Sequence, residues 1–196
     1  MKTEMKYDLF LPLGGQGSGK GTHSKLFLQE NPGFKYVETG ALFRALPEGH
    51  PLKVIANSGQ FVSDEDTEGL IKENMSQKSN YVLDGFPRQL SQAMWLVDSF
   101  ADKFNIYAVY LMLTREDMKE RIKQRLVEGG GRVDDANEEI VKKRLDSFFE
   151  KTVPAIKWLS INPDVKFIEI PVGGKSIDVN YNAIKNGLKS LGMKVR

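Results

Sequence analysis

A glycine-rich run, Gly14–Thr22 (GGQGSGKGT), constrains this chain more than any other segment. It follows the apolar segment Tyr7–Leu13, which has the composition of a buried strand, and leads into Lys20–Glu30, which has helical composition. Glycine lets the backbone turn tightly and aim successive N–H groups at one point. Lys20 adds a positive charge, and a helix N-terminus adds a partial one. This strand, loop and helix predict a site for the phosphate groups of a nucleotide.

The phosphate-loop pattern in its general form places Ser or Thr directly after the lysine. Here Gly21 has that position, and the hydroxyl group comes one residue later, at Thr22. The alternative interpretation is a flexible loop that binds nothing. A buried strand before the loop and a helix after it make that alternative the weaker one.

Strand-like and helix-like segments alternate along the chain. The expected strands are 7–13, 34–37, 81–83, 106–113 and 166–170, and the expected helices are 20–30, 63–77, 90–100, 114–127, 137–161 and 176–191. The alternation predicts a P-loop α/β fold of three layers, α/β/α, in which helices cover both faces of a five-stranded parallel sheet. Ligands of such sheets bind beyond the carboxyl ends of the strands.

Two of these helices carry local signals. The sequence from Ser63 to Asp66 is typical of a helix cap, so a helix should begin there. Pro154 lies inside the longest expected helix, 137–161, so we expect a kink near its middle.

The composition excludes several classes of function. The 196 residues include no cysteine, so disulfides and thiolate metal sites are excluded. The net charge is only +2, and no apolar run is long enough to cross a bilayer, so we expect neither nucleic acid nor a membrane as a partner. The apolar segment near the N-terminus is short and interrupted by Asp8, unlike a signal peptide. We therefore expect a single cytoplasmic domain over residues 1–196.

A second candidate segment, Asp84–Arg88 (DGFPR), follows the expected strand 81–83 and belongs to the same edge of the sheet as the glycine-rich loop. A carboxylate such as Asp84 can hold Mg²⁺ through water, because Mg²⁺ keeps most of its hydration shell. The guanidinium of Arg88 can form a forked pair of hydrogen bonds with a phosphate. An Asp-Gly pair alone indicates only a turn, but beside a phosphate loop the binding interpretation is the stronger one.

Four arginines later in the chain are further candidates. They are Arg121, Arg125, Arg132 and Arg144. The first two are four residues apart and share one helix face, where they are either site residues or solvated surface charges. Arg144 falls in a row with Ile140 and Phe148 that we expect to be buried, so its guanidinium needs an anionic partner such as a phosphate. Asp134 and Asp135 interact either with the next helix N-terminus or with arginine.

Together these pieces resemble the adenylate kinases over almost the whole chain. The matching residues are Gly14–Thr22, Thr39-Gly40 with Arg44, Gly59–Val62, Asp84–Arg88 with Gln92, Arg121, Arg125, Arg132 with Asp134-Asp135, Arg144 and Gly174-Lys175. The combination is far more specific than any one motif. Gly21 before Thr22 is itself the form of the loop seen in nucleoside monophosphate kinases.

The resemblance implies reversible, Mg²⁺-dependent phosphoryl transfer from ATP to AMP, giving two ADP. The residues implied to bind ATP are Gly17, Ser18, Gly19, Lys20, Gly21, Thr22, Arg121, Arg125 and Lys175, with Arg121 stacked on the adenine. Those implied to bind AMP are Thr39, Gly40, Arg44, Gln60, Phe61, Val62, Gly85, Phe86, Pro87, Arg88, Gln92, Arg132 and Arg144. The implied catalytic residues are Lys20, Arg88, Arg125, Arg132 and Arg144, with Mg²⁺ held through water near Thr22 and Asp84.

The resemblance also implies a division of the chain. The implied parts are a core (1–38, 63–126 and 137–196), an AMP-binding segment (39–62) and a short lid (127–136). Without cysteine the lid cannot hold the zinc found in some relatives with long lids. Relatives with short lids are commonly monomeric, so we expect a monomer whose partners are the two nucleotides.

The chain also departs from the family pattern. Ala41 stands where the family usually has Asp, and the segment 46–58 is shortened. The spacing from Arg132 to Arg144 is one residue longer, with Ala136 as the insertion. These departures concern the affinity for AMP and the rate of turnover rather than the class of reaction.

Two other functions stay open at this level. One is a kinase for UMP or CMP; the related pyrimidine nucleotide kinases have Asn at the place of Gln92 and Ala at that of Thr39, so both residues here favour adenine. The other is a weakly catalytic, ATP-binding switch, which Ala41 and the shortened segment support. The complete set of arginines argues against the switch, because a pure binder has no need to crowd positive charge at a transferring phosphate.

Overall fold

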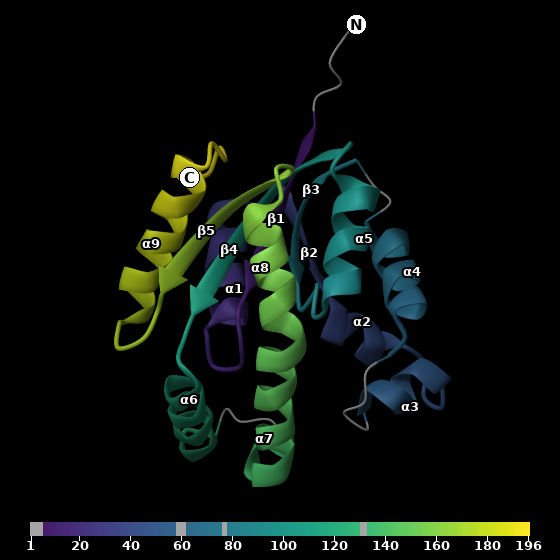
Figure 1. Ribbon diagram of the computed structural model, residues 1–196, viewed down its shortest axis with the longest axis vertical. Coiled ribbons are helices and arrows are strands. Elements are labelled where there is room, and N and C mark those ends of the chain that lie inside the picture. Colours follow the sequence, from purple (N-terminus) through teal and green to yellow (C-terminus); the bar gives the residue numbers. More distant parts are fainter. Residues whose placement is uncertain (1–5, 58–61, 76–77, 130–132) are drawn as a thin grey trace, which may run out of the picture.

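The centre of the molecule is a sheet of five strands in the order β2-β3-β1-β4-β5 (Figure 1). The computed structural model describes residues 6–57, 62–75, 78–129 and 133–196. The strands are β1 (Tyr7–Leu13), β2 (Phe34–Glu38), β3 (Asn80–Asp84), β4 (Phe104–Met112) and β5 (Val165–Pro171). Every pair of neighbouring strands is parallel, so the predicted five-stranded parallel sheet is confirmed.

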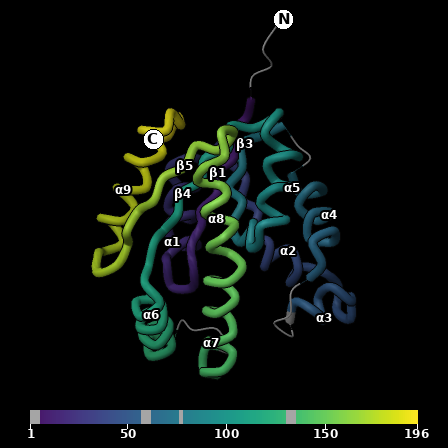
Figure 2. The backbone as a smooth tube through the Cα atoms, in the orientation of Figure 1, coloured from purple at the N-terminus to yellow at the C-terminus, as the bar shows by residue number. Residues whose placement is uncertain are grey.

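Helices cover both faces of this sheet, as the ribbon and the backbone tube show (Figures 1 and 2). On one face α1 (Lys20–Glu30) packs against β1, β2 and β3, and α9 (Ile177–Ser190) packs against β4 and β5. On the other face α5 (Leu90–Phe100) and α8 (Val153–Ile161) pack against each other. The three predicted layers are therefore present.

The other described helices lie mainly toward one end of the molecule. They are α2 (Thr39–Ala45), α3 (Pro51–Asn57), α4 (Asp64–Asn74), α6 (Arg115–Val127), the short 3₁₀ helix η1 (Val133–Ala136) and α7 (Glu138–Ser147). The arrowheads of β4 and β5 point toward that end, where α6 and α7 lie on one side and α2 and α3 on the other (Figure 1). Within the described ranges, no helix combines the length and the hydropathy that crossing a membrane requires.

The two central strands explain why the sheet is rigid. Leu9 and Leu11 of β1 and Ile106 and Ala108 of β4 are fully buried. A parallel strand between two helical layers has both faces covered, so its sequence is a continuous apolar run rather than an alternating one. The packed centre fixes the carboxyl end of β1, from which the glycine-rich loop emerges.

The expected helix 137–161 is interrupted. A π-helical turn, η2 (Phe148–Thr152), separates α7 from α8, and Pro154 lies in the first turn of α8. Proline lacks the N–H that an α-helical ladder requires, so the predicted irregularity occurs beside it. The buried row predicted along this helix is only partly present, because Ile140 is 36% exposed whereas Phe148 is buried. The reason is that α7 extends beyond the edge of the sheet (Figure 1).

Replacing Leu11 by Ala should lower the free energy of unfolding by about 2–5 kcal/mol, because the change removes buried methyl groups and leaves a cavity between two helical layers. Leu11 is 0% exposed. Urea unfolding followed by circular dichroism measures the effect. The control is Val54→Ala in α3, where the side chain is 58% exposed, and this variant should stay within about 0.5 kcal/mol of the wild type. Equal effects of the two substitutions would contradict the burial of β1.

Candidate active site

The glycine-rich loop joins the carboxyl end of β1 to the N-terminus of α1. Lys20 Nζ folds back over the loop and donates to the carbonyl oxygens of Gly14 (2.5 Å) and Gly15 (2.9 Å). Ser18 is buried, and its hydroxyl donates to Gly15 O (2.8 Å). Gly19, with φ of 86°, is the N-cap of α1 and has no side chain to cap the helix. The first N–H groups of a helix have no intrahelical partner, so those of α1, including Gly21, can bind an anion.

An open cavity of about 340 Å³ lies beside this loop. Its lining residues are Asp117, Glu120, Arg121, Gln124, Gly174 and Lys175. Arg121 donates from Nη1 to Gly17 O (2.9 Å) and from Nη2 to Val172 O (2.5 Å), which fixes its guanidinium between the loop and the end of β5. Lys175 Nζ donates to Pro171 O (3.0 Å). The cavity therefore brings together Arg121 and Lys175, which the resemblance implies for the base of ATP.

Asp84 ends β3 and is buried. Its Oδ2 accepts a hydrogen bond from the hydroxyl of Tyr36 in β2 (3.0 Å). Burial raises the pKa of the Asp84 carboxyl above its ordinary value; the positive charge of Lys20 and the Tyr36 hydrogen bond oppose this rise, and Glu38 adds to it.

The donors around Asp84 fit one kind of metal ion. Among the described residues, no group of three or more His, Cys, Asp or Glu side chains could hold a metal ion. A single carboxylate beside the lysine of a phosphate loop, with Thr22 exposed on the first turn of α1, fits a cation that keeps most of its water. Mg²⁺ has this preference, because it gives up its hydration reluctantly.

The turn after Asp84 packs against the start of α2. Gly85 has φ of 86°, and a Cβ at this position would lie 2.6 Å from Thr39 Oγ1, so glycine is required. Thr39 is buried and donates to Gly85 O (3.1 Å). Phe86 and Pro87 are buried, and the ring of Phe86 packs edge-on against Trp95 of α5. The turn is therefore anchored on both sides.

Arg44 is held by a carboxylate that the sequence analysis missed. Its Nη2 pairs with Glu38 Oε1 at 3.0 Å, beside the backbone of Gly40. Ala41, which stands where the resemblance leads us to expect Asp, cannot supply such a partner, whereas Glu38 at the end of β2 does. The Arg44 side chain is mostly exposed, so the pair is weak and an anionic ligand can replace Glu38.

Arg125 of α6 and Arg144 of α7 share one carboxylate, that of Asp135 in η1. Arg144 Nη1 lies 3.1 Å from Asp135 Oδ1, and Arg125 Nη2 pairs with Oδ2. The Asp135 side chain is 0% exposed. The anionic partner predicted for Arg144 is therefore this carboxylate in the structure. Of the two interactions considered for Asp135, pairing with arginine is the one observed.

Arg88 and Gln92 are joined in one turn. The backbone N–H of Arg88 donates to Gln92 Oε1 (2.8 Å), and Arg88 Nε donates to Gly85 O (2.7 Å). Gln92 is buried in the first turn of α5, and its Nε2 donates to Asp64 Oδ1 (2.8 Å). Asp64 begins α4, after the N-cap Ser63 and two residues after the buried Val62.

The predicted site residues differ in how far the structure describes them. Gln60, Phe61 and Arg132 lie outside the described residues. Most of the others lie at the carboxyl edge of the sheet, on the glycine-rich loop, on the Asp84 turn and on α2, and the rest lie on α6, on α7 and beside the cavity.

Sequence reasoning missed several residues that contact predicted site residues, among them Tyr36, Glu38 and Asp64. The spacing of Tyr36 and Glu38, two apart in a strand, was a usable signal, because such residues point to the same face. Asp64 gave no signal beyond its place in a helix cap.

His23 lies behind the loop, on α1. It is buried, and its ring stacks on that of Tyr181 in α9, with centroids 6.3 Å apart and an interplanar angle of 4°. Burial lowers the pKa of His23, and the positive charge of Arg121 lowers it further. The folded protein therefore favours the neutral imidazole.

Comparison with known proteins finds similarity to adenylate kinases, in agreement with the resemblance seen in the sequence. The family model described as adenylate kinase matches residues 12–162. An adenylate kinase of Prochlorococcus marinus is 37% identical over 153 residues, which cover 74% of this chain and 80% of the relative. Adenylate kinase isoenzyme 1 of Cyprinus carpio is 34% identical, covering 82% of this chain and 86% of the relative. The isoenzyme 1 of Rattus norvegicus is 33% identical, covering 95% and 96%.

Replacing His23 by Gln should change how stability depends on pH. Because the pKa of His23 is lowered in the folded state, the unfolded chain binds the proton more tightly. The wild-type free energy of unfolding should therefore be highest above about pH 6.5 and fall below it. Urea unfolding at pH 8, 6.5 and 5 should show that His23→Gln loses less stability on acidification than the wild type. Parallel curves would contradict the prediction.

Proposed function

This chain belongs to the adenylate kinase family, and we propose that it transfers the γ-phosphoryl group of ATP reversibly to AMP, giving two ADP. The observation that carries the proposal is the phosphate loop Gly14–Thr22, with Lys20 over it and an uncapped helix start beneath it. The Asp84 turn lies at the same edge of the sheet, so donors for a second phosphate are close by. This arrangement suits two nucleotides that meet end to end.

ATP binds with its phosphates in the loop. The N–H groups from Gly17 to Thr22 and the ammonium of Lys20 neutralise the phosphate oxygens. The base lies in the cavity between Arg121 and Lys175, where a guanidinium held flat by two carbonyl groups can stack on an aromatic ring.

Asp84, near Thr22, would hold through water the Mg²⁺ that accompanies ATP. When bound, it supplies positive charge that offsets the charge developing on the phosphate oxygens. Tyr36 keeps the Asp84 carboxylate in place through its hydroxyl. The other positive charges near the phosphates come from Lys20 and from arginine side chains.

AMP binds on the other side of the Asp84 turn, under the segment 39–62. Arg44 and Arg88 hold its phosphate, and Arg44 exchanges Glu38 for that phosphate. Thr39, Gly40, Val62 and the Gly85–Pro87 backbone surround the nucleoside. The sequence predicts the same role for Gln60 and Phe61, which lie outside the described residues. Gln92 recognises the adenine through its side-chain amide.

Transfer is direct and in line, without a covalent enzyme intermediate. Phosphoryl transfer asks the protein mainly for positioning and for stabilisation of charge on the equatorial oxygens. Lys20, Arg88, Arg125, Arg132 and Arg144 supply that charge. Water must be excluded, or ATP is hydrolysed, so the segment 39–62 and the lid 127–136 close over the core formed by the rest of the chain.

We further propose that the protein is a monomer. Size-exclusion chromatography coupled to light scattering tests this against the mass of 22.1 kDa. A location in the cytoplasm stays a prediction from the sequence.

One coupled assay of ADP formation tests the reaction. The purified protein is given Mg·ATP with AMP, CMP, UMP or GMP as acceptor. We expect rapid ADP formation with AMP and much slower formation with the others. A preference for CMP or UMP would assign a different monophosphate kinase, and tight ATP binding without transfer to any acceptor would favour the switch.

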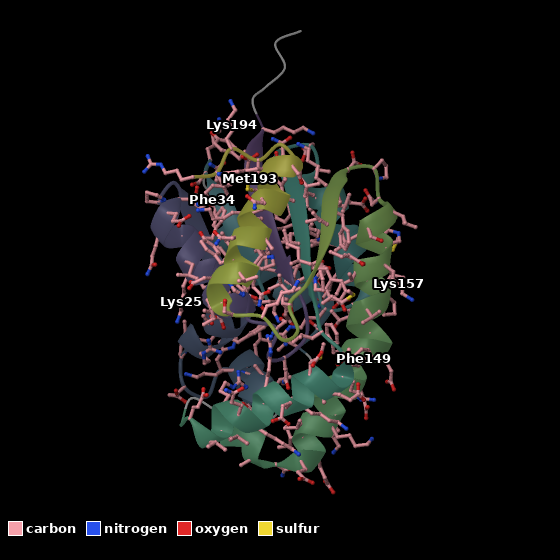
Figure 3. All side chains as sticks on the ribbon, turned by 90° about the vertical axis from the view of Figure 1, so that its left-hand side faces the viewer. Lys25, Phe34, Phe149, Lys157, Met193 and Lys194 are labelled. Carbon is pink, nitrogen blue, oxygen red and sulfur yellow. The ribbon has the colours of Figure 1, made fainter. Side chains whose placement is uncertain are left out.

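Replacing Arg88 by Ala should lower kcat by about 10²–10³-fold, because this cation stabilises charge that develops only in the transition state. Steady-state kinetics with AMP and Mg·ATP measures the loss. The control is Lys157→Ala, which removes an exposed cation labelled on the outer side of α8 (Figure 3) and should leave kcat unchanged. Turnover like that of the wild type in Arg88→Ala would refute its role.

A further inference from the structure

Asp64 joins two helices at the edge of the proposed AMP site. Its Oδ1 accepts hydrogen bonds from Gln89 Nε2 (2.5 Å) and Gln92 Nε2 (2.8 Å), and its Oδ2 accepts one from Ser91 Oγ (2.6 Å). All three donors lie at the start of α5, whereas Asp64 is the first residue of α4. A single carboxylate therefore accepts hydrogen bonds from three polar side chains at the start of α5.

These contacts fix the orientation of the Gln92 amide. The backbone N–H of Arg88 donates to Gln92 Oε1 (2.8 Å), which requires the amide oxygen on that side. The Asp64 carboxylate accepts from Nε2, which requires the amide nitrogen on the opposite side. An ionised carboxylate has no proton to donate, so the amide cannot be turned over without losing both bonds.

The fixed amide still has hydrogen-bonding capacity. A side-chain amide has two hydrogens on nitrogen and two lone pairs on oxygen, and the two bonds to Asp64 and Arg88 use one of each. One donor and one acceptor on neighbouring atoms match the edge of adenine, where N1 accepts and the N6 amino group donates. On the corresponding edge of guanine the pattern is reversed, because N1 carries a hydrogen and O6 accepts. An amide fixed in this orientation therefore favours adenine over guanine.

Asp64 remains ionised at neutral pH. Burial raises the pKa of its carboxyl, but the hydrogen bonds from Ser91, Gln92 and Gln89 together outweigh burial and bring the pKa below its ordinary value. A carboxylate that only accepts hydrogen bonds is what the fixed orientation of Gln92 requires.

Asp64 is distinct from the other acidic residues of this helix start. Ser63 caps α4 by accepting from the backbone N–H of Asp66 (3.2 Å), and its hydroxyl donates to the Asp66 carboxylate (2.5 Å). Glu65 is exposed. Asp64 instead accepts hydrogen bonds from the start of α5, so helix capping does not account for its position.

We propose that Asp64 is a positioning residue that sets the base selectivity of the acceptor site by orienting the Gln92 amide. The proposal rests on the proposed function, in which AMP is the acceptor and Gln92 contacts its base. Asp64 itself does not touch the nucleotide. It acts through Gln92 and, through the Arg88 backbone, on the turn that carries a phosphate-binding arginine.

Replacing Asp64 by Ala should raise KM for AMP about tenfold, because Gln92 loses a hydrogen bond to a charged group and its amide can then turn. The ratio of kcat/KM for AMP to that for GMP should fall by a similar factor, because a turned amide matches guanine, and KM for ATP should stay within about twofold. Asp64→Ser should give the same result if Asp64→Ala does not fold, because serine suits a helix start but its hydroxyl is too short to reach Gln92.

Two matched variants complete the experiment. Asp64→Asn should restore most of the selectivity, since its amide oxygen accepts from Gln92 and Gln89 while the Ser91 hydroxyl turns to accept from its nitrogen. Glu65→Ala removes a carboxylate from the same helix turn and should behave like the wild type in every measurement. Thermal unfolding of each variant is recorded alongside the kinetics.

The outcomes separate the two proposals. If the wild type transfers phosphate to none of the acceptors, the proposed function fails, and this result does not involve any Asp64 variant. If the wild type uses AMP but the Asp64→Ala and Asp64→Ser variants keep its AMP to GMP ratio, the positioning role is refuted. A loss of thermal stability with equal changes in KM for AMP, GMP and ATP would show a purely structural role and would also overturn the proposal.

Discussion

The parallel pairing of β3 with both β1 and β2 is the constraint on which the candidate site depends. Leu9 pairs with Tyr81 in one register and Glu38 with Asp84 in the other, so the three strands end at the same edge. The glycine-rich loop follows β1, the Asp84 turn follows β3 and α2 follows β2, so all three segments lie at this edge without long connecting loops. Because central parallel strands are buried on both faces, their apolar packing holds this edge rigid.

The cations at this edge are held by two kinds of partner. Backbone carbonyl groups, which carry no net charge, accept hydrogen bonds from Lys20 and Arg121. Carboxylates hold Arg44 and the Arg125–Arg144 pair, but they differ in strength. Glu38, whose partner Arg44 is mostly exposed, is easily replaced, whereas the fully buried Asp135 keeps two arginines together at a junction of α6, η1 and α7.

Much of the fold and part of the site could be predicted from the sequence, because the signals are local. Apolar runs separated by helical stretches predicted the strands, and the glycine run predicted the loop between β1 and α1. The limits of the prediction are also physical. Ile140 fits the spacing of a buried residue, yet it is exposed, because periodicity shows which face is apolar and not whether the helix extends past the core.

The sequence by itself determined that a phosphate loop follows a buried strand in a parallel α/β fold, and the resemblance it carries indicated the reaction. Only the tertiary structure decided the partners of the site residues. Asp64 and Gln92 are 28 residues apart, and Tyr36 and Asp84 are 48 apart. A helix-cap pattern describes Asp64 in terms of its own helix, while its hydrogen bonds come from another helix, which is brought close by packing on the sheet. Side-chain partners across such distances depend on the assembled layers, because no local pattern encodes them.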